Sequence, residues 1–129
     1  MIIDASALVA IILDEPDAEF ISSKVERARD RMTHAVSVYE AALAVARGRG
    51  QSPFEARRDV ELFLKEAEVT VVGLGPEEAS AAVDAFFRYG KGRHPAALNM
   101  GDCFSYACAK LRGMPLLYKG EDFAKTDLA

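Results

Sequence analysis

Short, mainly apolar runs alternate with helical patterns along this chain, and the alternation constrains its fold more than any other feature. The runs lie at residues 1–3, 32–36, 69–72 and 116–118. Runs of this kind are typical of strands buried on both faces of a sheet. Helices between consecutive strands indicate crossover connections, which join parallel neighbours. We therefore predict a three-layer α/β/α fold with a central, mostly parallel sheet of four to five strands, the fifth lying within 125–129.

Apolar residues at helical spacing predict the helices between these strands. The predicted helices cover 5–13, a segment opened by Pro16, 37–46, 53–67, 76–86 and a segment from Gly101 to Gly113. The patterns Ser37-Val38-Tyr39-Glu40 and Ser52-Pro53-Phe54-Glu55 match the capping box, which marks a helix start. In the last helix, the predicted inward stripe is Phe104, Ala107, Cys108 and Leu111.

Length and composition indicate one domain over residues 1–129, because half of the residues are apolar and can build a core without disulfides or structural metals. Cys103 and Cys108 lie five residues apart on one predicted helix and are expected to be free thiols. No basic segment precedes an apolar signal core, and no apolar run reaches the ~20 residues of a membrane span. We expect a cytoplasmic protein that does not cross a membrane.

Acidic residues follow or adjoin several of the predicted strands. Asp4 follows the first strand, Glu40 lies in the helix after the second, Asp102 opens the helix that leads to the last, and Glu121 and Asp122 follow that last strand. Each has a local explanation as a helix cap or a first-turn acid. In a parallel sheet, however, all of these positions lie at the carboxyl ends of the strands, where α/β proteins bind ligands.

Several carboxylates in one cleft repel each other, and a divalent cation removes this cost. Oxygen ligands without an accompanying set of His or Cys favour Mg²⁺ or Mn²⁺ over zinc or copper. Such ions activate water for phosphodiester hydrolysis. The net charge of −4 argues against nucleic-acid binding through charge alone, but it leaves metal-mediated contact open.

The stretch at residues 88–95 is basic, rich in glycine and without periodicity, so we predict a mobile loop. Its cations have two interpretations. They either gather at a helix C-terminus, where they interact with the dipole, or contact phosphates beside the acidic site, with Tyr89 available to stack on a base.

Four segments resemble the PIN domain, and more closely the VapC-type toxins of bacterial toxin–antitoxin pairs. They are Met1-Ile2-Ile3-Asp4-Ala5-Ser6, the segment Ser-Val-Tyr-Glu ending at Glu40, the run from His94 to Cys103, and Leu116-Leu117-Tyr118-Lys119-Gly120-Glu121-Asp122-Phe123. The resemblance implies a Mg²⁺-dependent endoribonuclease, for which Mn²⁺ would substitute. It also implies a homodimer, inhibited by a VapB-type antitoxin whose C-terminal segment crosses the groove.

The resemblance also implies roles for individual residues. Asp4, Glu40 and Asp102 correspond to the acidic triad, with Asp4 and Asp102 on the metal, and Ser6, Asn99 and Glu121 are candidates to support them. Many PIN domains carry a fourth aspartate where this chain has Gly120. Asp122 is the preferred substitute, Glu121 and Asp127 are alternatives, and a single metal ion is another solution. Candidate contacts to RNA phosphates are Lys91, Arg93 and Lys119.

Three other functions are compatible with parts of the sequence. Metal-independent RNA cleavage needs paired histidines, but the chain has only His34 and His94, and His34 is expected to be a polar strand residue. A phosphoryl-transfer receiver domain needs an aspartate after a central strand, and none follows Val69–Val72. The third is a catalytically weak PIN-like adaptor that binds a protein or RNA through the acidic groove, and Gly120 favours it.

Overall fold

The computed structural model describes all residues, Met1–Ala129, and contains one four-stranded sheet. Its strands are β1 (Ile2–Ile3), β2 (Met32–His34), β3 (Thr70–Val72) and β4 (Leu116–Leu117), in the order β3-β2-β1-β4. Every neighbouring pair is parallel. The predicted parallel sheet is thus confirmed, with four strands.

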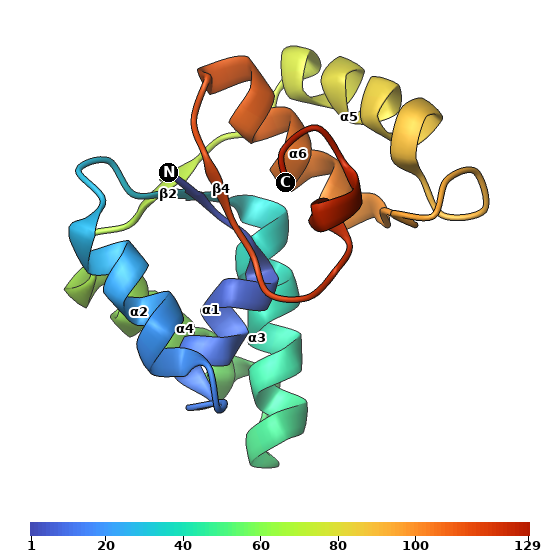
Figure 1. Ribbon diagram of the computed structural model, residues 1–129. Helices are drawn as coiled ribbons and strands as arrows, with labels where there is room; N and C mark the ends of the chain where they lie inside the picture. Colours follow the sequence, from blue (N-terminus) through green and yellow to red (C-terminus); the bar gives the residue numbers. More distant parts are fainter.

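Six α-helices connect the strands and cover both faces of the sheet (Figure 1). They are α1 (Ala5–Ile12), α2 (Ala18–Arg27), α3 (Ala35–Arg49), α4 (Pro53–Glu66), α5 (Pro76–Tyr89) and α6 (Met100–Arg112). Helices α1–α4 lie on one side of the strands, and α5 and α6 on the other (Figure 1). This is the predicted α/β/α arrangement. None of these helices combines the length and apolar character needed to cross a membrane.

The core consists of two apolar clusters, one on each face of the sheet. Ile3 and Leu117 pack into the cluster beneath α1–α4, whereas Ile2 and Leu116 pack into the cluster beneath α5 and α6. Successive strand residues point to opposite faces, so even strands of two residues supply both clusters. This explains why both residues of β1 and both residues of β4 are apolar.

The capping box predicted for Ser37 and Glu40 is wrong, because α3 begins two residues earlier. His34 is the N-cap residue, and its Nδ1 accepts a 3.2 Å hydrogen bond from the Ser37 backbone N–H. The Ser52–Glu55 pattern does begin α4, with Ser52 Oγ accepting from the Glu55 N–H at 3.2 Å. Tertiary packing therefore decides which of two similar local patterns is used.

Two further expectations differ from the structure. In α6, Leu111 is 47% exposed, while Cys103, Tyr106 and Ala109 are buried, because α6 is covered by the sheet, by α5 and by the C-terminal segment. The predicted strand within 125–129 is absent. Phe123–Lys125 forms a short 3₁₀ helix in this part of the chain. The expectation that both cysteines are free thiols is confirmed.

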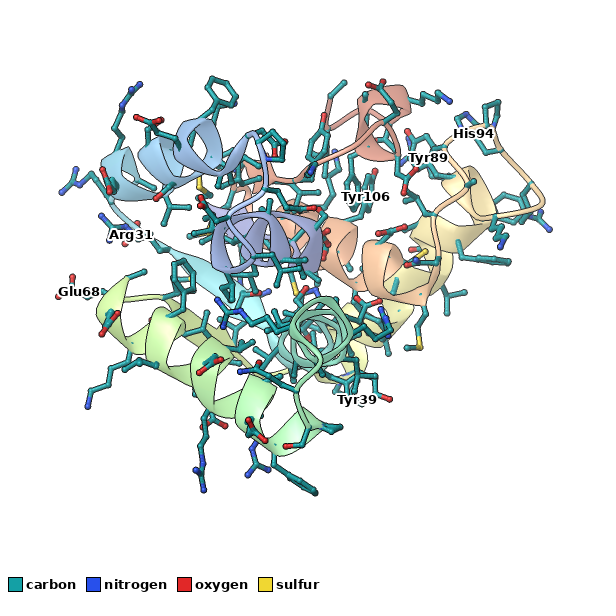
Figure 2. The ribbon with its side chains drawn as sticks, turned by 90° about the horizontal axis from the view of Figure 1, so that it is seen from below. Arg31, Tyr39, Glu68, Tyr89, His94 and Tyr106 are labelled. Carbon is teal, nitrogen blue, oxygen red and sulfur yellow. The ribbon has the colours of Figure 1, made fainter.

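The basic stretch after α5 is folded back on the helices. Helix α5 continues to Tyr89, and the chain is closed by a bridge between Gly90 and Leu98. Figure 2 shows the Tyr89 ring between His94 and Tyr106, with centroid distances of 5.0 and 5.6 Å. These contacts hold the Tyr89 ring against its neighbours, and stacking of this ring on a base stays a prediction.

We predict that Phe123→Ala lowers the free energy of unfolding by about 3 kcal/mol, because Phe123 is fully buried in the α5–α6 cluster and its loss leaves a cavity. The matched control is Phe20→Ala, since Phe20 is 64% exposed on α2 and its removal is expected to cost less than about 1 kcal/mol. Urea denaturation followed by circular dichroism measures both. Equal losses for the two variants would contradict the assigned packing of the C-terminal segment.

Candidate active site

A cleft of about 520 Å³ opens at the carboxyl ends of β1 and β4. The chain runs from β1 outward to β2 and β3, and then returns to place β4 on the other side of β1. The strand order therefore reverses between β1 and β4, which is where α/β sheets bind ligands. The cleft is lined by Asp4, Ala5, Ser6, Val9, Glu15, Glu40, Ala44, Arg47, Asn99, Asp102, Lys119, Gly120 and Asp122.

Asp4 is the most rigidly held of these acids. It ends β1, caps α1 and is only 4% exposed. Its Oδ2 accepts hydrogen bonds from the Ser6 N–H at 3.0 Å and from Ser6 Oγ at 2.6 Å, while its Oδ1 accepts from Ser105 Oγ at 2.5 Å. Ser6 Oγ in turn accepts from the Lys119 N–H at 3.0 Å, which ties the chain after β4 to the same carboxylate.

Asp102 and Asn99 form a reciprocal cap at the start of α6. Asn99 Oδ1 accepts from the Asp102 N–H at 2.9 Å, and Asp102 Oδ2 accepts from the Asn99 N–H at 3.0 Å. Burial raises the pKa of Asp102 from the usual 3.8 to about 7, although the bond from Asn99 acts in the opposite direction. The negative charges of Asp4, Asp122 and Glu40 raise this pKa further.

Glu40 reaches the cleft from α3 and lies against the backbone of Gly101. A Cβ atom built on Gly101 would overlap the Glu40 carboxylate, so the glycine leaves open the space that this carboxylate occupies. Burial, followed by the charge of Asp4, raises the pKa of Glu40. Gly101 therefore permits the close approach of an acid of the cleft to the start of α6.

The three alternatives for a fourth acid occupy different places. Asp122 lines the cleft, whereas Glu121 is exposed and does not line it. Asp127 lies elsewhere, because it accepts from Tyr106 Oη at 2.7 Å and from Lys110 Nζ at 2.8 Å. The bonds from Lys110 and Tyr106 lower the pKa of Asp127 to about 2.

Of the three predicted phosphate contacts, only Lys119 lines the cleft. Its Nζ lies 3.3 Å from both Glu15 and Asp17, so its charge is already partly balanced. Lys91 borders a separate apolar groove between α5 and α6. Arg93 donates to the Phe87 carbonyl at 3.2 Å and lies over its ring.

Sequence reasoning missed two polar residues at this site, Arg47 and Ser105. Arg47 is exposed at the cleft and follows Glu40 and Ala44 at the i+7 and i+3 spacings of one helix face. Ser105 follows Asp102 at i+3 and bonds to Asp4. Helical spacing from each predicted acid was the signal that could have found both.

The donor atoms suit a small, hard cation, although no three acidic, His or Cys side chains form a ready-made cage. Mg²⁺ is held through one or two carboxylates and keeps several waters, so it does not require such a cage. The close approach of the Glu40 carboxylate to the start of α6 places oxygen donors from three elements around one space. The residues present therefore fit a Mg²⁺ ion or a similar one.

Comparison with known proteins is consistent with this architecture. Residues 1–128 match the PIN domain family. Ribonuclease VapC30 of Mycobacterium tuberculosis is 47% identical over 129 residues, which are 100% of this chain and 96% of the relative. Ribonuclease VapC of Mycolicibacterium smegmatis is also 47% identical, over 100% of this chain and 98% of its own.

A solved structure shares the fold at low sequence identity. The crystal structure of Mycobacterium tuberculosis VapC20, described as a sarcin-ricin loop cleaving toxin, superposes with a TM-score of 0.75. It covers 95% of this chain and 92% of its own, with 15% identity. The chain therefore belongs to the PIN-domain family and, within that family, to the VapC ribonucleases.

We predict that Asp102→Asn stabilises the metal-free protein at about pH 8 by roughly 1–2 kcal/mol, a value reduced for solvent at the cleft mouth. The pKa of Asp102 is higher in the folded protein than in the unfolded chain, so this group destabilises the fold as the pH rises from about 4 to about 7. The advantage of the variant should shrink as the pH falls to about 5. Chemical denaturation in EDTA at several pH values measures it.

The control for this prediction is Asp84→Asn, which changes the same charge at an exposed position on α5. Its stability relative to the unmodified protein should vary little with pH. A pH-independent effect of Asp102→Asn would show that the raised pKa is absent.

Proposed function

We propose that this protein is a Mg²⁺-dependent endoribonuclease and the toxin of a type II toxin–antitoxin pair, acting as one PIN domain over residues 1–129. The observation that carries the proposal is the meeting of Asp4, Glu40 and Asp102 in one cleft at the β1–β4 switch point. The names of its VapC relatives support the same reaction.

In this proposal, Asp4 and Asp102 hold the metal ion, and Glu40 binds through water or orients the attacking water. Asp122 completes the acidic cluster and takes the place of the fourth aspartate, which is absent here because position 120 is a glycine. A bound Mg²⁺ lowers the pKa of water and offsets charge on the phosphate, and Mn²⁺ serves in its place. Ser6 and Asn99 keep the two metal-binding carboxylates in position through the hydrogen bonds described above.

The substrate phosphates need cations at the edge of this acidic cleft, and two residues are placed to provide them. Arg47 and Lys119 line the cleft from α3 and from the chain after β4. Lys91 borders the groove between α5 and α6, and Arg93 donates to the Phe87 carbonyl. Neither lines the cleft, so we assign the phosphate contacts to Arg47 and Lys119 instead. The ion pairs of Lys119 with Glu15 and Asp17 would be exchanged for contacts with RNA.

We further propose that the protein acts in the cytoplasm, as a homodimer that a VapB-type antitoxin inhibits. Acids without a metal attract a basic side chain, so an arginine or lysine from the antitoxin would occupy the cleft in place of the cation. For the homodimer, the exposed apolar side chains Val83, Phe86, Phe87 and Met100 around the α5–α6 groove offer a contact surface.

We predict that the purified protein cleaves transfer or ribosomal RNA fragments in Mg²⁺, that EDTA abolishes cleavage, and that Asp102→Asn reduces the rate at least about 100-fold, since it removes a direct metal ligand. The products should carry a 5′-phosphate and a 3′-hydroxyl, because the nucleophile is water. Asp84→Asn, with the same chemical change outside the cleft, should keep full activity. Gel assays with end-group analysis measure all five outcomes.

Cleavage that survives EDTA, or a cyclic phosphate product, would exclude the carboxylate mechanism. Absence of cleavage in Mg²⁺ and Mn²⁺, by a folded protein free of antitoxin, would instead favour the adaptor function.

A second prediction concerns the fourth acid. Asp122→Asn should weaken Mn²⁺ binding and slow RNA cleavage, each by about tenfold, because Asp122 lines the cleft and its charge acts on Asp102. Glu121→Gln, at the neighbouring exposed position, should leave both unchanged. Titration of Mn²⁺ by electron paramagnetic resonance and initial-rate kinetics provide the two measurements. The reverse ranking would assign the fourth acid to Glu121.

A further inference from the structure

A buried chain of hydrogen bonds lies behind the acidic cleft, and none of the roles assigned above uses most of it. It runs from Asp4 Oδ1 to Ser105 Oγ at 2.5 Å, and from Ser105 Oγ to His34 Nε2 at 2.8 Å. Ser37 Oγ lies 3.1 Å from the same His34 nitrogen. His34, Ser37 and Ser105 have no exposed surface, so water does not compete for these bonds.

The direction of these hydrogen bonds follows from the contact that His34 makes with the backbone. His34 Nδ1 accepts a hydrogen bond from the Ser37 backbone N–H, so Nδ1 carries no proton. The proton of the neutral ring is therefore on Nε2, and Nε2 is a donor. Burial lowers the pKa of His34 to about 4, which is consistent with a neutral ring. The N-cap of α3 thus selects the histidine tautomer.

The tautomer then fixes the serine hydroxyl. Because His34 Nε2–H donates to Ser105 Oγ, the hydroxyl proton of Ser105 is directed to Asp4 Oδ1, a carboxylate oxygen that lies nearer than the other neighbour, Ser37 Oγ at 3.5 Å. Ser6 holds the other oxygen of Asp4 through two hydrogen bonds. Both oxygens of the carboxylate are thereby held from opposite sides, and its rotation is prevented.

We propose that His34 and Ser105 are positioning residues that orient Asp4 for metal binding, with the start of α3 setting the direction of the hydrogen bonds. The inference rests on the proposed function, in which Asp4 is a metal ligand. Neither residue touches the metal or the RNA. His34 acts through Ser105, and Ser105 acts through Asp4, so their effects on metal affinity should not be independent.

The first test examines the hydrogen bonds of His34 in the metal-free protein, by nitrogen-15 NMR of the histidine rings. We expect His34 to show the neutral Nε2–H tautomer, with its proton protected from exchange with solvent. Ser105→Ala should accelerate that exchange, because the proton loses its shorter hydrogen bond and keeps only the 3.1 Å contact with Ser37 Oγ. A neutral Nδ1–H tautomer, or a charged ring, would overturn the proposal whatever the protein does with metals.

The second test measures Mn²⁺ affinity by electron paramagnetic resonance in a double-mutant cycle. Ser105→Ala should weaken Mn²⁺ binding by about tenfold, as the loss of a ligand's supporting hydrogen bond generally does. His34→Asn keeps a side-chain acceptor for the Ser37 N–H but is too short to reach Ser105, so it should weaken binding severalfold without removing the cap of α3. The double variant should bind no more weakly than Ser105→Ala alone.

Cys108→Ala is the matched control, because Cys108 is equally buried on α6 but belongs to the apolar cluster and not to the hydrogen-bonded chain. It should lower stability and leave Mn²⁺ affinity unchanged. Unchanged affinity in Ser105→Ala, or additive losses in the double variant, would overturn the positioning role and leave the proposed function intact. Absence of Mn²⁺ binding by the unmodified protein would overturn both.

Discussion

The buried carboxylate of Asp4 is the interaction on which this structure depends. It ends β1, caps α1, accepts from Ser105 on α6 and, through Ser6, is bonded to the chain that follows β4. Three parts of the chain that are distant in sequence therefore meet at one side chain: the β1–α1 segment, α6 and the segment after β4. A buried carboxylate is costly unless its oxygens are satisfied, and here the backbone and two serines satisfy them. The packing that closes the fold is the same packing that aims this acid into the cleft.

Asp102 and Glu40, two other acids of the cleft, oppose folding when they are ionised. Burial and mutual repulsion raise the pKa values of Asp102 and Glu40, so the ionised site is a cost in the absence of a cation. Apolar clusters on both faces of the sheet offset that cost. A chain that keeps destabilising charges together in one place, while most of its surface acids are spread out, has the arrangement expected of a functional site.

Sequence patterns predicted the parts of this fold that depend on local or periodic signals. The apolar runs located all four strands, and the acids after them located the cleft, because a parallel sheet brings the carboxyl ends of its strands to one edge. Ser37 was misassigned as the cap of α3 for a long-range reason. The ring of His34 bonds to Ser105, which is 71 residues away, and this contact moves the start of α3 away from the local capping pattern. The contacts that Arg93 and Tyr89 make in the structure were likewise not predictable from spacing.

The charges of the protein constrain how it can recognise RNA. The net charge is −4, and Lys119 at the cleft is already paired with Glu15 and Asp17. Counterion release from a basic surface therefore contributes little to affinity. In the proposed function, binding would come from a cation in the cleft, from the few basic side chains around it, and from the shape of the RNA. The same reasoning would account for the proposed inhibition, because a partner that supplies a positive side chain would satisfy the acids and exclude the metal in one contact.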